Sequence, residues 1–355
     1  MNKLLLTLGV TALSPLALAK PVIVTSIKPV SMVVAAITGD RADIEQIVSN
    51  SASPHDFALR PSDLRKIANA DTVVWVGESL ERFLEKPLEN AGKEASSIEW
   101  LALNGMKLHN FAENHDDHES HDDHEGHDHD KHHDDHDDHD HDKHHDDHDD
   151  HEGHDHDKHH DDHDDHEDHD HDDEHHEGHE GHDHSGVDPH VWLSPDNAKI
   201  LAQVVTKRLS EIDGQNAVYY QANLAKFEQG LTAKDAQIRA ALNKVNTVPY
   251  IVFHDGYSYF ERHYGLQHAG EITVSPERKP GAKKVAELRH EIEEHKVQCV
   301  FSEPQFSPAI VKALLEGSNV NTAPLDPLGG KIKLDSNAYY RFLDSLSDQF
   351  LSCLG

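Results

Sequence analysis

Short apolar runs alternate with amphipathic segments in the N-terminal part of the chain. PVIVTSI (21–27) and DTVVWVG (71–77) are rich in β-branched residues, which favours buried strands. Gly39 marks a helix end, and Pro61 marks a helix start. The pattern predicts strands at 21–27, 43–48 and 71–77 and helices at 30–37, 61–68 and 80–91, with a break at Pro87. This βαβαβα order predicts a parallel sheet with helices on both faces.

Beyond position 190 the pattern is first helical and then alternates again. Ser194 followed by Pro195 is a helix start, and this helix should run to about residue 212. A second helical pattern covers residues 215–245 without a proline. At about 1.5 Å per residue it would span roughly 45 Å, enough to connect two lobes. The remaining pattern predicts strands at 248–253, 297–301 and 322–325 and helices at 256–263, 283–295, 308–315 and 337–351.

These elements predict an α/β protein of two lobes with parallel sheets, joined by one long α-helix. We expect the N-terminal lobe at residues 20–213, the linking helix at 214–246 and the C-terminal lobe at 247–355. Residues 113–186 interrupt the first lobe with a segment that has no apolar periodicity, and we expect this insert to be a disordered acidic loop.

The first 19 residues have the layout of a secretion signal. Lys3 supplies positive charge, an apolar run extends to Leu18, and Ala17-Leu18-Ala19 fits a signal peptidase site. The apolar run is too short, and too interrupted by Pro15, for a membrane span. We therefore expect cleavage after Ala19 and export of a mature protein that is not embedded in a membrane.

Residues 115–184 consist only of His, Asp, Glu, Lys, Gly and a single Ser. This tract holds 28 of the 36 histidines, and the sequence HDHDKHHDDHDDH occurs in it three times. Imidazole and carboxylate groups are ligands of Zn²⁺, Ni²⁺ and Cu²⁺. The repeats therefore predict auxiliary, low-affinity metal sites, for which the candidates are His127, His129, His139, His141, His154 and His156.

The tract also carries most of the charge. The formal net charge is −35, and the segment from Glu113 to His184 has 35 acidic residues against three lysines. The rest of the chain is nearly neutral, which argues against binding to nucleic acid. Because protonated imidazole cannot bind a metal ion, the capacity of the tract should fall below about pH 6.

Cys299 and Cys353 are the only cysteines of the chain. In an exported protein they are expected to form one disulfide, which the chain-entropy model values at roughly 4 kcal/mol. The alternative is a pair of thiolate metal ligands, although no C-x-x-C spacing supports it.

Four polar residues outside the tract lie near the ends of predicted elements. His55 lies in the loop after the second strand, His190 precedes the helix that starts at Ser194, and His254 and Asp326 each end a strand. Ligands of open α/β sheets bind beyond the carboxyl ends of the strands. A single histidine is more often a loop or capping residue, which is the role expected for His263, His268, His290 and His295. The spacing alone does not prove a site.

Four segments closely resemble motifs of the periplasmic zinc-binding proteins of ABC zinc-uptake transporters, the ZnuA-type family. They are SPHDFALRPSD (53–63), DPHVWLSP (188–195), VFHDGYSYFE (252–261) and LDPLGG (325–330). The resemblance covers essentially the whole mature chain. It implies two Rossmann-like lobes joined by one long helix, with zinc held in the cleft between them.

Carried over by motif, the resemblance makes His55, His190 and His254 the imidazole ligands of the zinc ion. Asp326 would be the fourth ligand or a near neighbour, with water completing the site. The disulfide of the family's C-terminal lobe would map onto Cys299 and Cys353.

The resemblance also bears on the choice of metal. Manganese-binding relatives carry a carboxylate at the position of His254, and three neutral imidazoles suit Zn²⁺ better than Mn²⁺. Pro54 stands where some zinc-binding members have Glu, so no role of that Glu carries over. Glu303 follows a predicted strand and could support a ligand or form a structural ion pair.

The function implied is capture of Zn²⁺ in the periplasm and its delivery to the membrane permease of an ABC transporter. Such a protein is not an enzyme and is expected to be a monomer, with the tract collecting, buffering or sensing metal. Three histidines and an open position also occur in zinc hydrolases, but no motif here places a general base. An exported metal-storage or adhesion protein is the other alternative, in which the tract would function and the three isolated histidines would be dispensable.

Overall fold

The computed structural model describes residues 19–111, 186–273, 276 and 280–355. These residues belong to one unit, Met1–Glu113 with Glu180–Gly355. The second unit, Asn114–His179, lies outside the described residues, as does the predicted signal segment up to Leu18. The six candidate histidines of the tract also lie outside them: His127, His129, His139, His141, His154 and His156.

The first sheet has four parallel strands in the order β2-β1-β3-β4. The two central strands are almost completely buried, whereas the edge strand β2 alternates between exposed and half-buried positions. A strand covered on both faces is a continuous apolar run, which is why the sequence predicted the central pair clearly. The strands are β1 (Val22–Thr25), β2 (Asp43–Gln46), β3 (Thr72–Trp75) and β4 (Ser97–Glu99).

Four helices connect the strands of this sheet: α1 (Lys28–Thr38), α2 (Pro61–Asn69), α3 (Glu78–Glu81) and α4 (Glu85–Asn90). The helix predicted at 80–91 is therefore interrupted, with a 3₁₀ turn at Arg82–Leu84 between α3 and α4. Pro87 explains the break, because it has no N–H to donate and its ring clashes with the carbonyl group four residues earlier.

The second sheet repeats the same arrangement, with four parallel strands in the order β6-β5-β7-β8. Its side chains alternate between two cores. Tyr250 and Val252 face the large core shared with the first lobe, whereas Ile251 and Phe253 pack against a smaller cluster that includes residues of α8 and α9. The elements are β5 (Tyr250–His254), β6 (Gly270–Thr273), β7 (Cys299–Ser302), β8 (Asn321–Pro324), α8 (Ala282–Glu294) and α9 (Ala309–Leu314).

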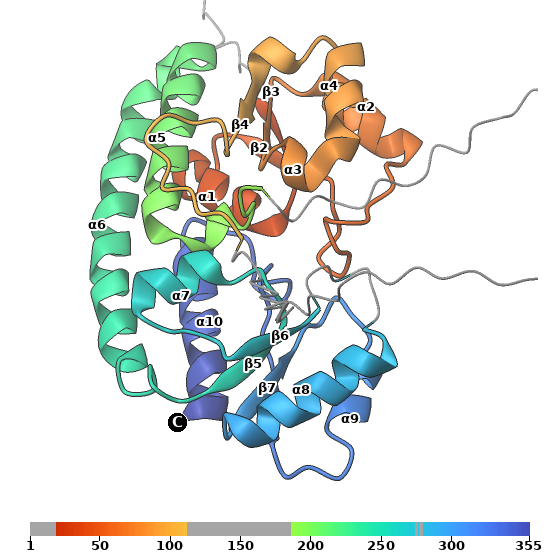
Figure 1. Cartoon of the computed structure of the whole chain (residues 1–355). Coiled ribbons are helices and arrows are strands. Elements are labelled where there is room, and N and C mark those ends of the chain that lie inside the picture. The colour runs from red at the N-terminus through yellow and green to blue at the C-terminus, as the bar shows by residue number, and fades with distance from the viewer. Residues whose placement is uncertain (1–18, 112–185, 274–275, 277–279) are drawn as a thin grey trace, which may run out of the picture. The chain divides into compact units, whose positions relative to one another are not determined.

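Four further helices hold the two sheets in one body: α5 (Pro195–Ile212), α6 (Ala217–Leu242), α7 (Ser258–Tyr264) and α10 (Ala338–Leu354). The 26 residues of α6 span about 39 Å and run beside both sheets (Figure 1). α6 packs against α1, α5 and α10. The C-terminal helix α10 also packs against α1 and therefore contacts the first lobe. The predicted fold class, two parallel-sheet α/β lobes with one long helix, is confirmed.

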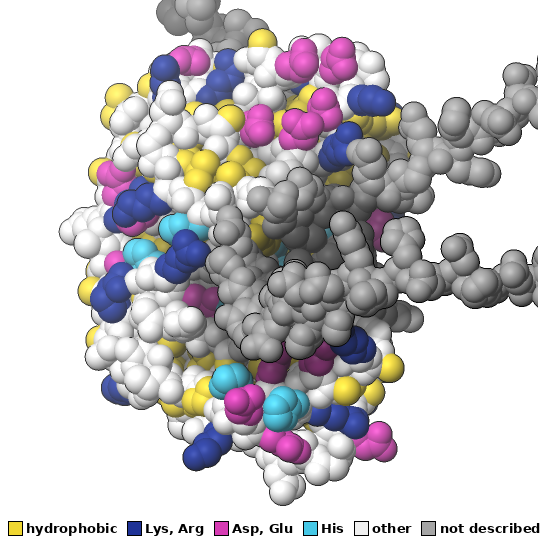
Figure 2. Space-filling view, viewed as in Figure 1, with side chains coloured by type: hydrophobic (Ala, Val, Ile, Leu, Met, Phe, Trp, Pro, Cys, Tyr) yellow, Lys and Arg dark blue, Asp and Glu magenta, His cyan; other side chains and the backbone are white. Residues whose placement is uncertain are grey.

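Cys299 at the start of β7 and Cys353 near the end of α10 form a disulfide, with a Cα–Cα distance of 5.9 Å. The expected disulfide is therefore present, and the alternative of two thiolate ligands is not. No helix in the described part of the chain is long and apolar enough to cross a membrane. On the face seen in Figure 2, Lys and Arg side chains are interspersed with Asp and Glu side chains.

Candidate metal centre

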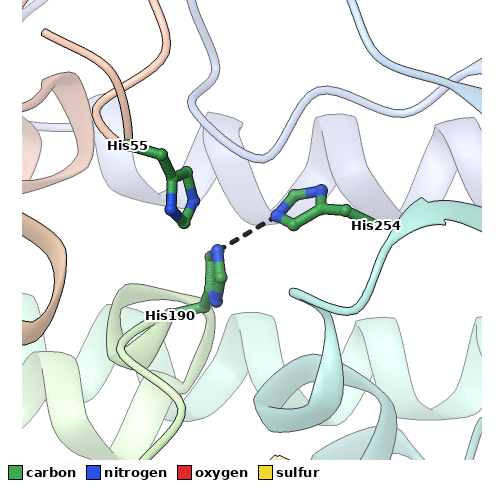
Figure 3. A group of neighbouring side chains, drawn as sticks. All are labelled: His55, His190 and His254. Carbon is green, nitrogen blue, oxygen red and sulfur yellow. Dashed lines mark hydrogen bonds between the residues drawn. The ribbon is translucent and has the colours of Figure 1, made fainter. Parts of the chain in front are cut away.

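Three histidines from distant parts of the sequence meet in the folded chain (Figure 3). His55 lies in the loop after β2, His190 lies just before the 3₁₀ turn that leads into α5, and His254 is the last residue of β5. One ring nitrogen from each lies within 4.8 Å of the other two. Their exposed fractions are only 8%, 1% and 2%. Within residues 19–111, 186–273, 276 and 280–355, this is the only group of at least three His, Cys, Asp or Glu residues able to hold a metal ion.

The topology of the second sheet places His254 beside a carboxylate. β5 and β7 are neighbours at the centre of the sheet, and the chain leaves them toward opposite edges, which makes their carboxyl ends the switch point of the sheet. His254 ends β5 and Glu303 directly follows β7. The Nδ1 atom of His254 lies 2.6 Å from Oε1 of Glu303, and both side chains are buried.

His190 has a matching partner two residues earlier in the chain. Oδ1 of Asp188 accepts the backbone N–H of His190 at 2.9 Å and lies 2.6 Å from its Nδ1 atom. The Ser258 hydroxyl donates to the other carboxylate oxygen, and the Tyr259 hydroxyl donates to the Asp188 carbonyl at 2.8 Å. Asp188 is fully buried, so these bonds fix the rotamer of a charged group that has no contact with solvent.

These carboxylates determine which nitrogen of each ring is left to face the centre. A neutral imidazole that donates Nδ1–H to a carboxylate keeps its lone pair on Nε2. The Nε2 atoms of His190 and His254 lie 3.1 Å apart. Two imidazoles bound tetrahedrally to zinc at about 2.05 Å would have their nitrogens about 3.3 Å apart. The pair is therefore already close to the spacing that a zinc ion requires.

Charge and burial act in opposite directions on these groups. Burial lowers the pKa of His254, but the Glu303 carboxylate raises it more strongly, and the net change is upward. Burial raises the pKa of Asp188, but the interaction with His190 and the hydrogen bonds outweigh it, and its pKa is lowered. The two buried carboxylates thus favour a positive charge beside them.

The rings line a cavity of about 10 Å³, roughly the space that one water-sized particle needs. Its wall also includes Pro54, Trp192, Phe306 and Leu328. Trp192 is held by its indole N–H, which donates to the Pro327 carbonyl at 2.7 Å. Such a site can enclose a bare ion and at most a very small additional ligand.

Asp326, the fourth residue predicted from the sequence, is not a member of this histidine group. Its Oδ1 atom accepts hydrogen bonds from the Leu328 N–H at 3.1 Å and from Gln305 Nε2 at 2.9 Å, and its Oδ2 atom accepts from the Gly330 N–H at 2.9 Å. The carboxylate therefore holds the turn after β8. Gln305 and Leu328 line the cavity, so Asp326 contacts residues of the cavity wall but is not itself part of that wall.

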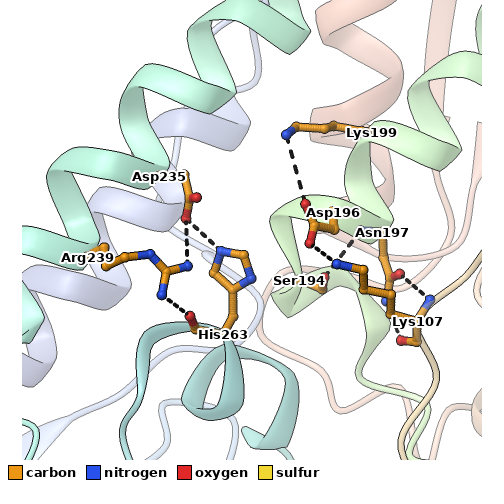
Figure 4. A network of polar contacts seen from close by, with 8 residues as sticks. All are labelled: Lys107, Ser194, Asp196, Asn197, Lys199, Asp235, Arg239 and His263. Atoms are coloured by element: carbon orange, nitrogen blue, oxygen red, sulfur yellow. Dashed lines mark hydrogen bonds and ion pairs between the residues drawn. The ribbon is translucent and has the colours of Figure 1, made fainter.

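A polar network fixes the segment that carries His190 (Figure 4). The Ser194 hydroxyl accepts the Asn197 N–H at 3.2 Å and caps α5. Asn197 accepts the Lys107 N–H at 2.9 Å and donates to the Lys107 carbonyl at 3.1 Å, while Lys107 Nζ pairs with Asp196 at 2.6 Å. Nearby, His263 Nε2 lies 2.6 Å from Asp235, which ties α7 to α6. The Leu193 N–H donates to the His190 carbonyl at 3.1 Å, which links His190 to the segment that leads into α5.

The insert begins and ends close to the same histidine. Asn110 and Val187 form an antiparallel bridge. The Phe111 N–H donates to the Gly186 carbonyl at 3.3 Å, and the Asp188 N–H donates to the His109 carbonyl at 2.8 Å. The rings of Phe111 and His190 have centroids 6.5 Å apart. We call this paired segment, residues 109–111 with 186–188, the stem.

The structure brings His55, His190 and His254 together and adds two carboxylates to them. The sequence left the role of Glu303 open and gave none to Asp188. A signal for Asp188 was present in D-P-H, because an Asp two positions before a residue can accept its backbone N–H and reach its side chain. Loop or capping roles were expected for the other histidines. Among them, His263 pairs with Asp235 and His268 pairs with Glu261.

Comparisons with known proteins show the family of the chain. Residues 23–353 match the sequence model of the family described as "Zinc-uptake complex component A periplasmic". The chain is 42% identical over 357 residues to the high-affinity zinc uptake system protein ZnuA of Haemophilus influenzae, covering 100% of this chain and 99% of the relative. It is 35% identical over 352 residues to the ZnuA protein of Yersinia pestis, covering 96% of this chain and 93% of the relative.

Solved structures share the fold. A crystal structure of ZnuA superposes with a TM-score of 0.66 at 22% identity, covering 95% of this chain and 100% of that chain. A zinc-bound ZnuA deletion mutant superposes with a TM-score of 0.65 at 20% identity, covering 95% and 99%.

Proposed function

The chain belongs to the family of periplasmic A components of zinc-uptake complexes, and on that premise we propose that it captures Zn²⁺ with His55, His190 and His254. The observation that carries the assignment is the convergence of three buried imidazoles from three separate segments on one point. An uptake component of this kind binds its cargo and releases it unchanged, so the protein is not an enzyme.

Three features of the site support zinc as the cargo. Imidazole is a borderline ligand that suits Zn²⁺ better than the hard, oxygen-preferring ions Mg²⁺, Ca²⁺ and Mn²⁺. The Nε2 spacing of 3.1 Å fits a tetrahedral ion. The charge of a divalent ion is balanced by Asp188 and Glu303, which lie behind His190 and His254. We propose that solvent or Asp326, after a rearrangement of its turn, completes the coordination.

The two carboxylates would act on the cargo through the rings. Each accepts the Nδ1–H of its histidine, which holds the ring in the tautomer with Nε2 free and makes that nitrogen a stronger donor to the metal. Because both carboxylates are buried among fixed hydrogen bonds, little reorganisation is needed when the ion enters.

We further propose how the protein reaches the periplasm, where it delivers zinc and what its tract does. The protein is exported, its signal segment is cleaved after Ala19, and it acts as a monomer. It carries zinc between two lobes, 20–213 and 247–355, linked by the helix at 214–246, to the membrane permease of an ABC transporter. The histidines of the tract, His127, His129, His139, His141, His154 and His156 among them, serve as weak auxiliary sites that collect or sense metal.

Zinc titration in competition with a chelator tests the assignment. The protein without residues 115–184 should bind one zinc ion tightly, and H55A, H190A and H254A should each weaken that binding by at least about 100-fold. The control is H290A, because His290 has a 78% exposed side chain on α8 and, among the described residues, forms an ion pair only with Glu294. In the full chain, tight zinc binding that survives replacement of all three histidines by Ala would instead favour a storage or adhesion protein that functions through its tract.

A further inference from the structure

A second cavity lies in the first lobe and is lined in part by the segment that follows His55. Three stretches line it: Lys28 at the start of α1, residues 46–50 at the end of β2 and beyond it, and residues from Phe57 to Lys66 that lead into and form α2. Its volume is about 450 Å³, within the range of small-molecule binding sites. It lies at the carboxyl end of β2, where ligands of open α/β sheets bind.

The charges that line this cavity do not cancel. Asp63 is the only carboxylate in the lining, and it is occupied: Oδ2 accepts the Arg60 N–H at 3.0 Å and Oδ1 lies 3.4 Å from Lys66 Nζ. Lys66 also donates to the Gln46 carbonyl at 2.9 Å. Within the described chain, the Lys28 ammonium and the Arg60 guanidinium form no ion pair with a carboxylate.

The backbone adds to this positive charge. α1 begins at Lys28, has 11 residues and carries no acidic residue in its first turn. The positive end of its dipole therefore lies at the same wall as the Lys28 side chain. Ser49, Asn50 and Ser62 add side chains that can donate hydrogen bonds. Lys28 is only partly exposed, and burial lowers its pKa, so an anion in the cavity would relieve an uncompensated charge.

We propose that this cavity binds a small multivalent oxyanion, a phosphate or a di- or tricarboxylate, held between Lys28 and Arg60. A planar guanidinium forms paired hydrogen bonds with the oxygens of a carboxylate or phosphate, and an ammonium supplies the facing point charge. The volume admits an anion the size of citrate but no larger polymer. The site is separate from the three histidines and does not depend on their role in zinc capture.

Calorimetry on the metal-free full chain at pH 8 tests the site, because the histidines of the tract are then neutral and do not attract anions. Inorganic phosphate and citrate are titrated separately. We expect a submillimolar dissociation constant for at least one of them, weakened at least tenfold in K28Q/R60Q. K86Q removes the same kind of charge from an exposed position of the same lobe and should leave anion binding unchanged.

Amide spectra place the anion. Bound phosphate or citrate should shift the resonances of residues 46–50 and 57–66, with smaller changes in the second lobe. Phosphate binding without citrate binding, or the reverse, identifies which oxyanion the cavity selects. Zinc affinity of K28Q/R60Q, measured alongside, should equal that of the unaltered protein and shows that the variant is folded. Binding of neither anion, or equal binding by K28Q/R60Q, would overturn the proposal whatever the outcome for zinc.

Discussion

Oε1 of Glu303 lies 2.6 Å from Nδ1 of His254, where the neighbouring strands β5 and β7 end. Removing its charge while keeping its shape isolates what the carboxylate contributes. E303Q should lower zinc affinity by about 10–100-fold, the usual effect of losing a partner of a ligating histidine. Chelator competition measures this, with E316Q as the control, since Glu316 is exposed and lies outside the site. Equal affinities in E303Q and E316Q would mean that the ion pair is structural only.

Deleting the tract separates its contribution from that of the three histidines. Without residues 115–184 the stem is retained, so His190 should keep its position. We expect the tight zinc site to remain with its affinity unchanged, while the total number of zinc ions bound falls. Calorimetry at pH 7.5 reports both quantities. Loss of the tight site in the deleted protein would show that the tract supplies one of its ligands.

His268 makes stability dependent on pH at the alkaline end. Burial lowers its pKa, but Glu261, whose oxygens lie 2.8 and 3.0 Å from Nδ1, raises it more strongly, to about 9. A histidine with a raised pKa stabilises the fold while it is protonated. Its contribution is complete below the ordinary pKa of about 6.5 and is lost as the pH rises through about 9.

The variant H268Q should therefore unfold more easily than the unaltered metal-free protein at pH 6, by about 2–3 kcal/mol. The difference should shrink to near zero by pH 10. Urea denaturation at several pH values measures the difference, and H290Q is the exposed control. A difference that does not change with pH would show that His268 is neutral in the folded protein.

Glu81 should have a comparable effect nearer to neutral pH. Burial raises its pKa to about 7, although the Val76 N–H, which donates to Oε2 of Glu81 at 2.7 Å, opposes the change. An acid whose pKa is raised in the fold favours the folded state when it is protonated. This advantage is complete below about pH 4.5 and is lost as the pH rises through about 7.

We expect E81Q to gain stability relative to the unaltered protein between pH 5 and pH 8, by on the order of 2–3 kcal/mol. Urea denaturation at the two pH values shows this, with E89Q as an exposed control in the neighbouring helix. Parallel stability curves for E81Q and the unaltered protein would indicate that Glu81 is ionised throughout.

The sequence predicted the central strands and two of the edge strands, β2 and β8, but it missed the edge strands β4 and β6. VIVT and TVVW are apolar because helices cover both faces of the sheet, and that signal needs no tertiary information. The edge strands Ser97–Glu99 and Gly270–Thr273 are short and contain charged residues. They are strands because β3 and β5 offer backbone partners, which a local pattern does not reveal.

The candidate site was likewise only partly predictable from the sequence. Each of the three histidines was visible at the end of an element, but their convergence depends on how the lobes pack, and only the family resemblance indicated it. Asp326 also follows a strand, yet its carboxylate is engaged by the Leu328 and Gly330 N–H groups of the following turn. Position at a strand end therefore does not tell whether a polar side chain faces a ligand or its own backbone.

The stem has a consequence for how this protein can evolve. The chain leaves and re-enters the described body at one paired point, Asn110 with Val187, so the number of residues between them can change without shifting His190. Tandem copies of HDHDKHHDDHDDH are the kind of sequence that replication slippage lengthens or shortens. Under the role proposed for the tract, selection can adjust how much metal the protein gathers, copy by copy, while the three-histidine site is inherited unchanged.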